Sequence, residues 1–211
     1  MNLEQLTNHL NEFHRKVISV MSPIVGITPT LSPIEIIIRR LFVSGCIDAT
    51  ADLASFVIYI NNWLGLDEKS PSIYTGEEVT AKEFTVAHET GHYFHFQNLE
   101  MRRISPKHED DRRKNKRVDR IINYNELTAE FFVCCYFDET EGIEEFFSGR
   151  GAKEHGGAFV NDVHDIYMSI SPREERKEMT KWLVTHSYDY ARRKLKGSPT
   201  LDAFRNIVVE I

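Results

Sequence analysis

Apolar residues recur at helical spacing over the start of the chain. Side chains three or four residues apart lie on one face of an α-helix, and this pattern joins Leu3, Leu6, Leu10, Phe13, Val17 and Val20. We therefore expect an amphipathic helix over residues 3–20. The segment that follows, Ser22–Pro33, is rich in Ser, Thr and Pro, and we expect it to form a turn or linker.

The segment Ile34–Asn61 is rich in β-branched residues, which favour strands. Gly45 interrupts it, and its last apolar run ends at a pair of asparagines that is typical of a turn. We expect three short antiparallel strands here, one of them over Phe56–Asn61. A helix over Ile34–Phe42 is the alternative.

Two apolar helices are expected in the middle of the chain, separated by the strongly charged segment Arg102–Arg120. Thr80 and Glu83 have the spacing of a capping box, which predicts a helix from about Ala81 to Phe96. That helix is apolar on nearly all sides and is therefore expected to be buried. The second helix is expected over Asn123–Phe137.

After a loop over Gly149–Gly157, helices are expected over Phe159–Ile170 and Arg173–Lys194. Together the elements predict an α+β fold: a small antiparallel sheet and a buried helix, followed by a mostly helical C-terminal lobe. We expect one domain over residues 1–211. It would have an N-terminal lobe over about 1–100, a charged insertion over about 101–121 and a helical C-terminal lobe over about 122–211.

The composition is that of a soluble globular protein, with 41% apolar and 27% charged residues. A net charge of −6 argues against nucleic acid as a partner. The longest uncharged stretch, Val17–Ile34, contains three prolines and a glycine, and we expect no membrane-spanning helix and no secretory signal. Two of the three cysteines, Cys134 and Cys135, are adjacent, which does not suit a disulfide framework, so we expect a cytoplasmic protein.

The sequence His88-Glu89-Thr90-Gly91-His92 lies within the helix predicted over residues 81–96. Residues four apart project from one helix face about one turn apart, so both imidazoles can reach a single Zn²⁺ ion. Glu89 is offset by about 100° and is expected to act as a general base rather than as a ligand. The alternative is a buried helix whose histidines form only hydrogen bonds, although burying these groups together without a metal is costly.

A catalytic zinc site needs a third protein ligand. The metzincin arrangement does not apply, because it requires glycine and histidine where this chain has His95 and Asn98. Glu126 and Glu130 lie one turn apart at the start of the second apolar helix, where two carboxylates need a reason to be buried. We expect Glu126 to bind zinc and Glu130 to accept the free N–H of a liganding histidine. A merely polar face at the helix start is the alternative.

These motifs resemble those of the gluzincin metallopeptidases, which pair His-Glu-x-x-His with a glutamate on a following helix. Residues 82–95 are also similar to the active-site helix of ImmA/IrrE-type metallopeptidases, in which an E-x-x-A-x-x-F stretch supplies the last ligand. Glu126, Ala129 and Phe132 match that stretch. The N-E-x-x-x-E form resembles the archaeal minigluzincins.

The resemblance covers roughly residues 55–137 and implies a zincin-like fold. In such proteins a meander of strands precedes the active-site helix, and its edge strand binds the substrate backbone. This implies that Phe56–Asn62 is the edge strand, with Ile58, Ile60 and Asn62 as substrate-binding residues. The minigluzincin resemblance also implies a latency segment at Phe204–Ile211, for which a last packed strand is the alternative.

The oxyanion that develops during peptide hydrolysis is commonly stabilised by a histidine, tyrosine or arginine. His164 shares a helical face with Val163 and Tyr167 and is our candidate catalytic residue for this role, with packing in the core as the alternative. His155, in the glycine-rich loop, is a second candidate. His95 is expected to pack in the core or in the wall of a cleft.

The sequence therefore predicts a zinc-dependent metallopeptidase that acts on a polypeptide, for example a regulatory protein. His88, His92 and Glu126 would hold the metal, and Glu89 would deprotonate the attacking water. Two alternatives are a latent or non-catalytic zinc protein that serves as a regulatory or binding module, and a protein that binds nucleic acid through Arg102–Arg120. The sequence makes no prediction of the oligomeric state.

Overall fold

The computed structural model describes residues 2–28, 35–39, 49–52, 57–61, 76–96, 116–140 and 157–194. Within these ranges the helices are α1 (Leu3–Val25), α2 (Gly76–Phe96), α3 (Lys116–Thr140), α6 (Gly157–Ser169), α7 (Arg173–Thr185) and α8 (Tyr188–Lys194). The strands are β1 (Glu35–Arg39), β2 (Ala49–Asp52) and β3 (Val57–Asn61). None of the described helices is both long enough and apolar enough to cross a membrane.

α1 carries the apolar face that the sequence predicts, and it continues five residues beyond the expected end at Val20. It begins with a capping box, in which the Asn2 side chain accepts from the Gln5 backbone N–H at 2.8 Å. It ends at Gly26, whose φ of 70° is the left-handed conformation that glycine adopts without steric cost. Ser22 and Pro23, expected to open a linker, therefore belong to the last turn of α1.

The predicted fold class, α+β with a small antiparallel sheet, is wrong. Most of the residues that the structure describes lie on the six helices. The short strands form a mixed sheet of order β1-β3-β2, in which β1 runs parallel to β3 and only β2 runs antiparallel to it. β-Branched residues favour strands locally, but they do not specify a strand's partner or direction, because pairing is a tertiary contact.

The same sheet order corrects the prediction that Phe56–Asn62 is an edge strand. β3 lies in the centre, with Ile58 paired to Ile36 of β1 on one side and to Ala51 of β2 on the other. Its backbone hydrogen-bonding groups are used within the sheet, so Ile58 and Ile60 are not available to pair with a substrate backbone. Asn62 lies outside the described residues.

Both central helices begin earlier than the sequence predicts. α2 starts at Gly76, so the predicted capping box at Thr80 and Glu83 lies inside the helix. α3 starts at Lys116, so Glu126 is about three turns into the helix rather than at its start. The reason is that charged residues such as lysine and arginine have good helix propensities, and the end of the charged segment extends the helix instead of preceding it. The remainder of that segment lies outside the described residues.

The predicted helix over Arg173–Lys194 is two helices. His186 has extended backbone dihedrals (φ −121°, ψ 135°) and ends α7. Ser187 immediately precedes α8, and its hydroxyl oxygen accepts from the Tyr190 backbone N–H at 3.4 Å. The chain therefore turns at His186, and the α7 end points toward α2 and α3.

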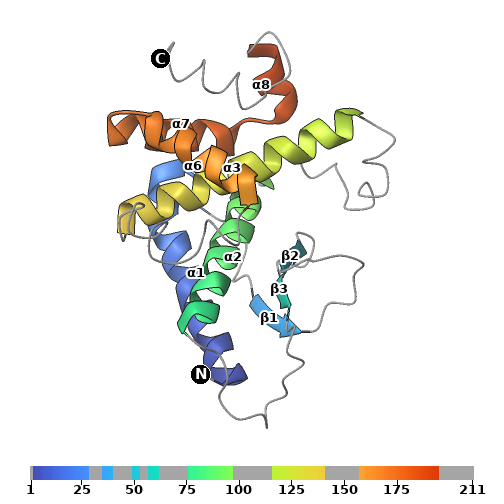
Figure 1. The fold of residues 1–211 in the computed structure, drawn as a ribbon, viewed down its shortest axis with the longest axis vertical. Coiled ribbons are helices and arrows are strands. Elements are labelled where there is room, and N and C mark those ends of the chain that lie inside the picture. The colour runs from blue at the N-terminus through green and yellow to red at the C-terminus, as the bar shows by residue number, and fades with distance from the viewer. Residues whose placement is uncertain are drawn as a thin grey trace.

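The core forms where the helices cross. α2 lies between α1 and the sheet and packs against α3 (Figure 1). α3 also packs against α6 and α7. Aromatic rings join these layers: Phe94 of α2 lies 5.2 Å from Phe132 of α3, and Phe131 lies 5.7 Å from Tyr167 of α6. Each such pair adds about 0.5–1.5 kcal/mol to the stabilisation that comes from burial alone.

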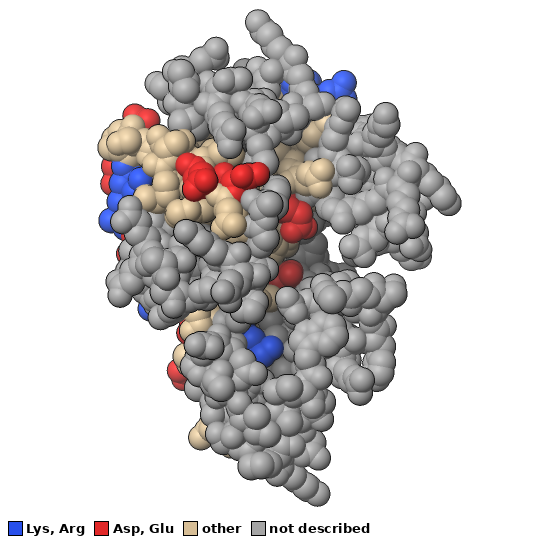
Figure 2. All heavy atoms as spheres, viewed as in Figure 1, with Lys and Arg blue, Asp and Glu red and all other residues tan. Residues whose placement is uncertain are grey.

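An ion-pair cluster closes the ends of α3 and α7. Arg176 lies 3.0 Å from Asp138, Arg173 lies 3.0 Å from Glu139, and Lys177 lies 3.1 Å from Glu139. Figure 2 shows basic and acidic side chains side by side at this edge of the molecule. Because Asp138 and Arg176 are mostly buried, with 10% and 15% of their side chains exposed, this pair is better protected from salt than a surface pair.

α1 is joined to α2 by a buried polar contact. The Nδ1 atom of His14 lies 2.8 Å from the Thr90 hydroxyl oxygen, which donates its own hydrogen to the Val86 carbonyl at 2.6 Å. His14 is 2% exposed. Burial, with a smaller contribution from Arg15, lowers the pKa of His14 to about 4, so the imidazole is neutral in the folded protein at pH 7.

We expect acid to destabilise the fold through His14. The unfolded chain binds a proton near pH 6.5 and the folded protein only near pH 4, so the free energy of unfolding falls as the pH drops through this interval. At pH 5 the loss from this one group is about 2 kcal/mol. Urea unfolding at pH 7 and pH 5 measures it. His14→Gln should show a correspondingly smaller difference between the two pH values, and an unchanged difference would contradict the assignment.

Candidate metal centre

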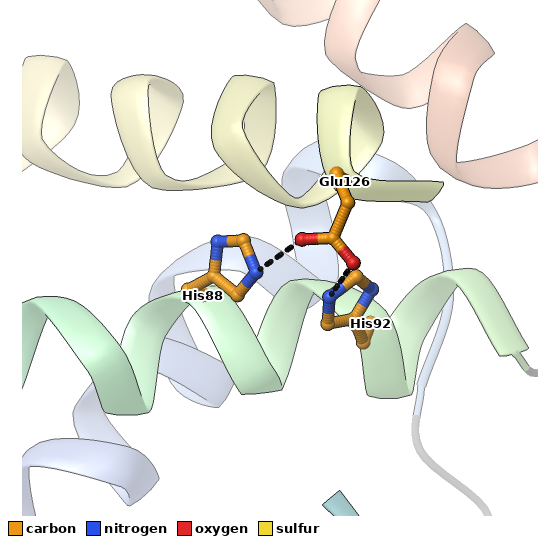
Figure 3. Close-up of side chains that lie close together, drawn as sticks. All are labelled: His88, His92 and Glu126. Carbon is orange, nitrogen blue, oxygen red and sulfur yellow. Dashed lines mark ion pairs between the residues drawn. The ribbon is translucent and has the colours of Figure 1, made fainter. Parts of the chain in front are cut away.

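Three side chains from two helices converge beside the contact between α2 and α3. His88 and His92 project from one face of α2, and Glu126 projects toward them from α3 (Figure 3). The Oε2 atom of Glu126 lies 3.2 Å from Nε2 of His88, and its Oε1 atom lies 3.6 Å from Nε2 of His92. One ligand atom from each residue lies within 4.8 Å of the other two. The structure thus brings together the three residues that the sequence singled out as ligands.

These distances suit a shared metal ion. Two ligand atoms that are each about 2.1 Å from an ion, at a tetrahedral angle, lie about 3.4 Å apart. The two nitrogen–oxygen distances, 3.2 Å to one oxygen of Glu126 and 3.6 Å to the other, are close to that value. The imidazole rings are nearly perpendicular, with an interplanar angle of 85° and centroids 4.7 Å apart, and in both rings Nε2 faces Glu126. The donor set, two imidazoles and one carboxylate, is one that Zn²⁺ accepts.

Glu130 lies behind His88, on the same face of α3 one turn after Glu126. Its Oε1 atom lies 2.8 Å from Nδ1 of His88, the ring nitrogen that faces away from the three converging atoms. A carboxylate in this place can accept the Nδ1–H and so keep Nε2 unprotonated and directed at a metal. The role predicted for Glu130, as the acceptor for a liganding histidine, stays a prediction.

The electrostatics of the cluster favour a cation. Burial opposes protonation of His88, but the carboxylates of Glu130 and Glu126 on either side of the ring outweigh it and raise the pKa of His88 well above its usual range. Burial likewise opposes ionisation of Glu126, but its contacts with His88 and His92 lower its pKa far below the usual range. A positive charge between these groups is therefore stabilised by its surroundings.

Glu89 adds a third carboxylate to this region. It is on α2, next to His88 in the sequence, and is 9% exposed, while Glu130 is 4% exposed. The converging group consists of His88, His92 and Glu126 and does not include Glu89. The carboxylates that the structure places against the imidazoles are those of Glu126 and Glu130, each within 3.2 Å of a ring nitrogen of His88.

A glycine allows the two helices that carry His88, His92 and Glu126 to approach each other. Gly91 lies between His88 and His92 on α2, and a Cβ atom built on it would be 3.0 Å from Cα of Ala129 and 3.1 Å from Cβ of Phe132, both on α3. Backbone atoms of α3 thus occupy the space that any other side chain would need. The close approach is what lets Glu126 reach the imidazoles across the helix pair.

The structure does not bring the other predicted site residues into this group. His164 is on α6, and its Nδ1 atom lies 3.7 Å from Asp165 of the same helix, so a role for His164 at the oxyanion stays a prediction. His155 and the segment Phe204–Ile211 lie outside the described residues. Cys134 and Cys135 are buried free thiols.

Two buried residues lie close to His92 and Glu126 along the two helices, and the sequence pattern does not mark them as functional. His95 is 0% exposed, as expected for core packing, and burial together with the nearby His92 ring lowers its pKa to about 4. Tyr124 is 1% exposed, and its ring lies 5.6 Å from that of His95. The available signal was the position of Tyr124, two residues before Glu126 in Tyr-Asn-Glu, but an aromatic residue in an apolar helix predicts only packing.

Comparison with known proteins returned no match: no protein-family model matches the chain, and no curated protein or solved structure is significantly similar to it.

Gly91→Ala should destabilise the protein, although alanine within a helix ordinarily adds about 1 kcal/mol of stability relative to glycine. The added methyl group would press on the α3 backbone, and overpacking of this kind costs about 1–3 kcal/mol. We therefore expect a lower melting temperature, measured by circular dichroism on the metal-free protein. A melting temperature equal to or above that of the wild type would show that the helices can separate without cost.

Proposed function

We propose that this protein is a zinc-dependent metallopeptidase, with a single metal ion held by His88, His92 and Glu126. The observation that supports it most directly is the position of the Glu126 carboxylate, which lies 3.2 and 3.6 Å from two imidazole nitrogens of another helix. The placement of Glu130 behind His88 supports it further, because metal-binding histidines commonly donate their second ring N–H to a carboxylate. The motif resemblance to gluzincins agrees with this proposal.

In this proposal Glu89 and Glu130 have separate roles in peptide hydrolysis. Zinc, when bound, supplies polarisation of the scissile carbonyl and activation of a water for attack. Glu89 accepts the proton from the attacking water and donates it to the leaving amine. Glu130 keeps His88 in the tautomer and orientation that present Nε2. The substrate in this proposal is a polypeptide.

We further propose a cytoplasmic location. Support comes from Cys134 and Cys135, which are adjacent, buried and free, as thiols are where the compartment is reducing. Oxidation of neighbouring thiols in the core of α3 would also disturb its packing.

The proposal predicts about one zinc ion per chain. His92→Gln removes a ligand, and we expect the affinity for zinc to fall by about 100-fold or more, the upper end of what loss of an outer-shell partner alone costs. Competition with a chromogenic chelator measures the affinity. His9→Gln, a change of the same kind on the half-exposed face of α1, should retain the wild-type affinity. Equal affinities in the wild type and both variants would mean that zinc does not bind at His92.

Glu89→Gln should separate metal binding from catalysis. The amide keeps the size of the side chain but cannot take up a proton, so we expect wild-type zinc content and a fall in peptide hydrolysis of about 100-fold or more. Cleavage of an unstructured protein such as casein, followed by mass spectrometry of the new termini, measures activity. The control is Glu83→Gln on the same helix, where Glu83 pairs with His9 at 2.8 Å.

The zinc-binding and cleavage measurements also distinguish a peptidase from a non-catalytic zinc protein. If the wild type binds zinc tightly but cleaves no polypeptide, and Glu89→Gln changes nothing, the chain is a non-catalytic zinc protein, as in the regulatory or binding module considered from the sequence. If Glu89→Gln cleaves as well as the wild type, Glu89 is not the base.

A further inference from the structure

The C-terminal end of α7 receives one side chain from each of the two helices that carry the proposed ligands. The last carbonyl groups of a helix have no partner within the helix. The carbonyl of Val184 lies 3.3 Å from Nδ1 of His95, on α2, and the carbonyl of His186 accepts from the Tyr124 hydroxyl, on α3, at 2.9 Å. Because His95 and Tyr124 are 0% and 1% exposed, protein groups rather than solvent supply these hydrogen bonds.

This junction lies next to the ligands in the sequence and in space. His95 follows His92 by three residues, close to one turn of α2, and Tyr124 precedes Glu126 by two residues on α3. The rings of His95 and Tyr124 also pack on each other, with centroids 5.6 Å apart. The end of α7 therefore holds α2 and α3 together within about a turn of the points from which the ligands project.

Small helix movements matter at a metal site. Two residues span about 200° of a helix, so Tyr124 and Glu126 leave α3 on nearly opposite sides, and a fixed Tyr124 restricts rotation of α3 about its axis. A carboxylate about 6 Å from the axis moves about 1 Å when the helix rotates by about 10°. Metal–ligand distances tolerate only about 0.2 Å, so a rotation of this size would break the convergence of the three ligands.

We propose that Tyr124 and His95 are positioning residues for the metal centre, which use the end of α7 to fix α2 and α3 relative to each other. The inference rests on the proposed metal binding. Neither residue belongs to the group of converging ligands, so both act through the helices rather than on the ion. The competing view is that they only complete the hydrogen bonding of α7, in which case their loss affects stability alone.

Tyr124→Phe tests the proposal with a well-matched control. It removes one buried hydroxyl and keeps the ring. Tyr167→Phe does the same at the far end of α3, where the Tyr167 hydroxyl donates to Asp138 at 3.1 Å and the residue is 0% exposed. Both variants should lose a similar amount of stability. We expect only Tyr124→Phe to weaken zinc binding, by about 10-fold, the low end of the range for residues that orient a ligand.

The measurements are chelator competition for zinc and the absorption spectrum of the Co²⁺-substituted protein, both well below the melting temperatures. A weaker affinity and an altered Co²⁺ spectrum for Tyr124→Phe, with wild-type values for Tyr167→Phe, support the proposal. Wild-type values for both variants, or equal losses in both, overturn it while the metal site stands. If the wild type itself binds neither ion, the proposed function fails and this inference with it.

His95→Phe is an independent second test, because it removes the other hydrogen-bond donor to α7 and retains an aromatic ring against Tyr124. We expect a loss of zinc affinity similar to that in Tyr124→Phe. In the double variant the losses should be less than additive, since both bonds serve the same junction. Full additivity would mean that the two residues act separately, which contradicts a shared positioning role.

Discussion

The direct packing of α2 against α3 at Gly91 is the constraint on which the site depends. Two helices usually pack with their axes 8–10 Å apart, a separation set by the side chains between them. Here no side chain intervenes at Gly91, and the backbone of Ala129 comes within 3.0 Å of the position of a Cβ atom. This close approach brings a carboxylate on one helix within 3.2 Å of an imidazole on the other. A glycine that would weaken an isolated helix is therefore what allows the carboxylate and the imidazoles of the helix pair to meet.

Charged side chains lie next to this contact, and neutral polar contacts lie farther from it. Glu126 faces the Nε2 atoms of both imidazoles, and Glu130 lies against the other side of His88. A buried carboxylate is costly unless it is paired, and here the buried Glu130 carboxylate lies 2.8 Å from Nδ1 of His88. Further out, the polar contacts are neutral: His14 with Thr90 toward α1, and His95 and Tyr124 with the end of α7. Neutral hydrogen bonds can hold the helices in place without adding charge to the core.

The sequence predicted helices better than it predicted the sheet. The apolar stripe of α1 and the apolar runs of α2 and α3 reflect contacts that each helix makes along its own length, so their period is visible locally. Helix starts were missed at Gly76 and Lys116, because charged residues neither forbid a helix nor mark its beginning. The sheet was misjudged because β1 pairs with β3, while β2, which lies between them in the chain, is on the far side. No local pattern encodes such a crossover.

For the candidate site, the sequence alone determined that His88 and His92 share a helix face and that Glu126 and Glu130 share another. These placements follow from the period of the α-helix and need no knowledge of the fold. Only the tertiary structure decided that the two faces meet, that Gly91 lets them meet closely, and that the end of α7 holds both helices through His95 and Tyr124. The physical reason is the distance along the chain over which each effect acts. Periodicity acts over a few residues, whereas a carboxylate is placed against an imidazole dozens of residues away by packing that involves the whole core.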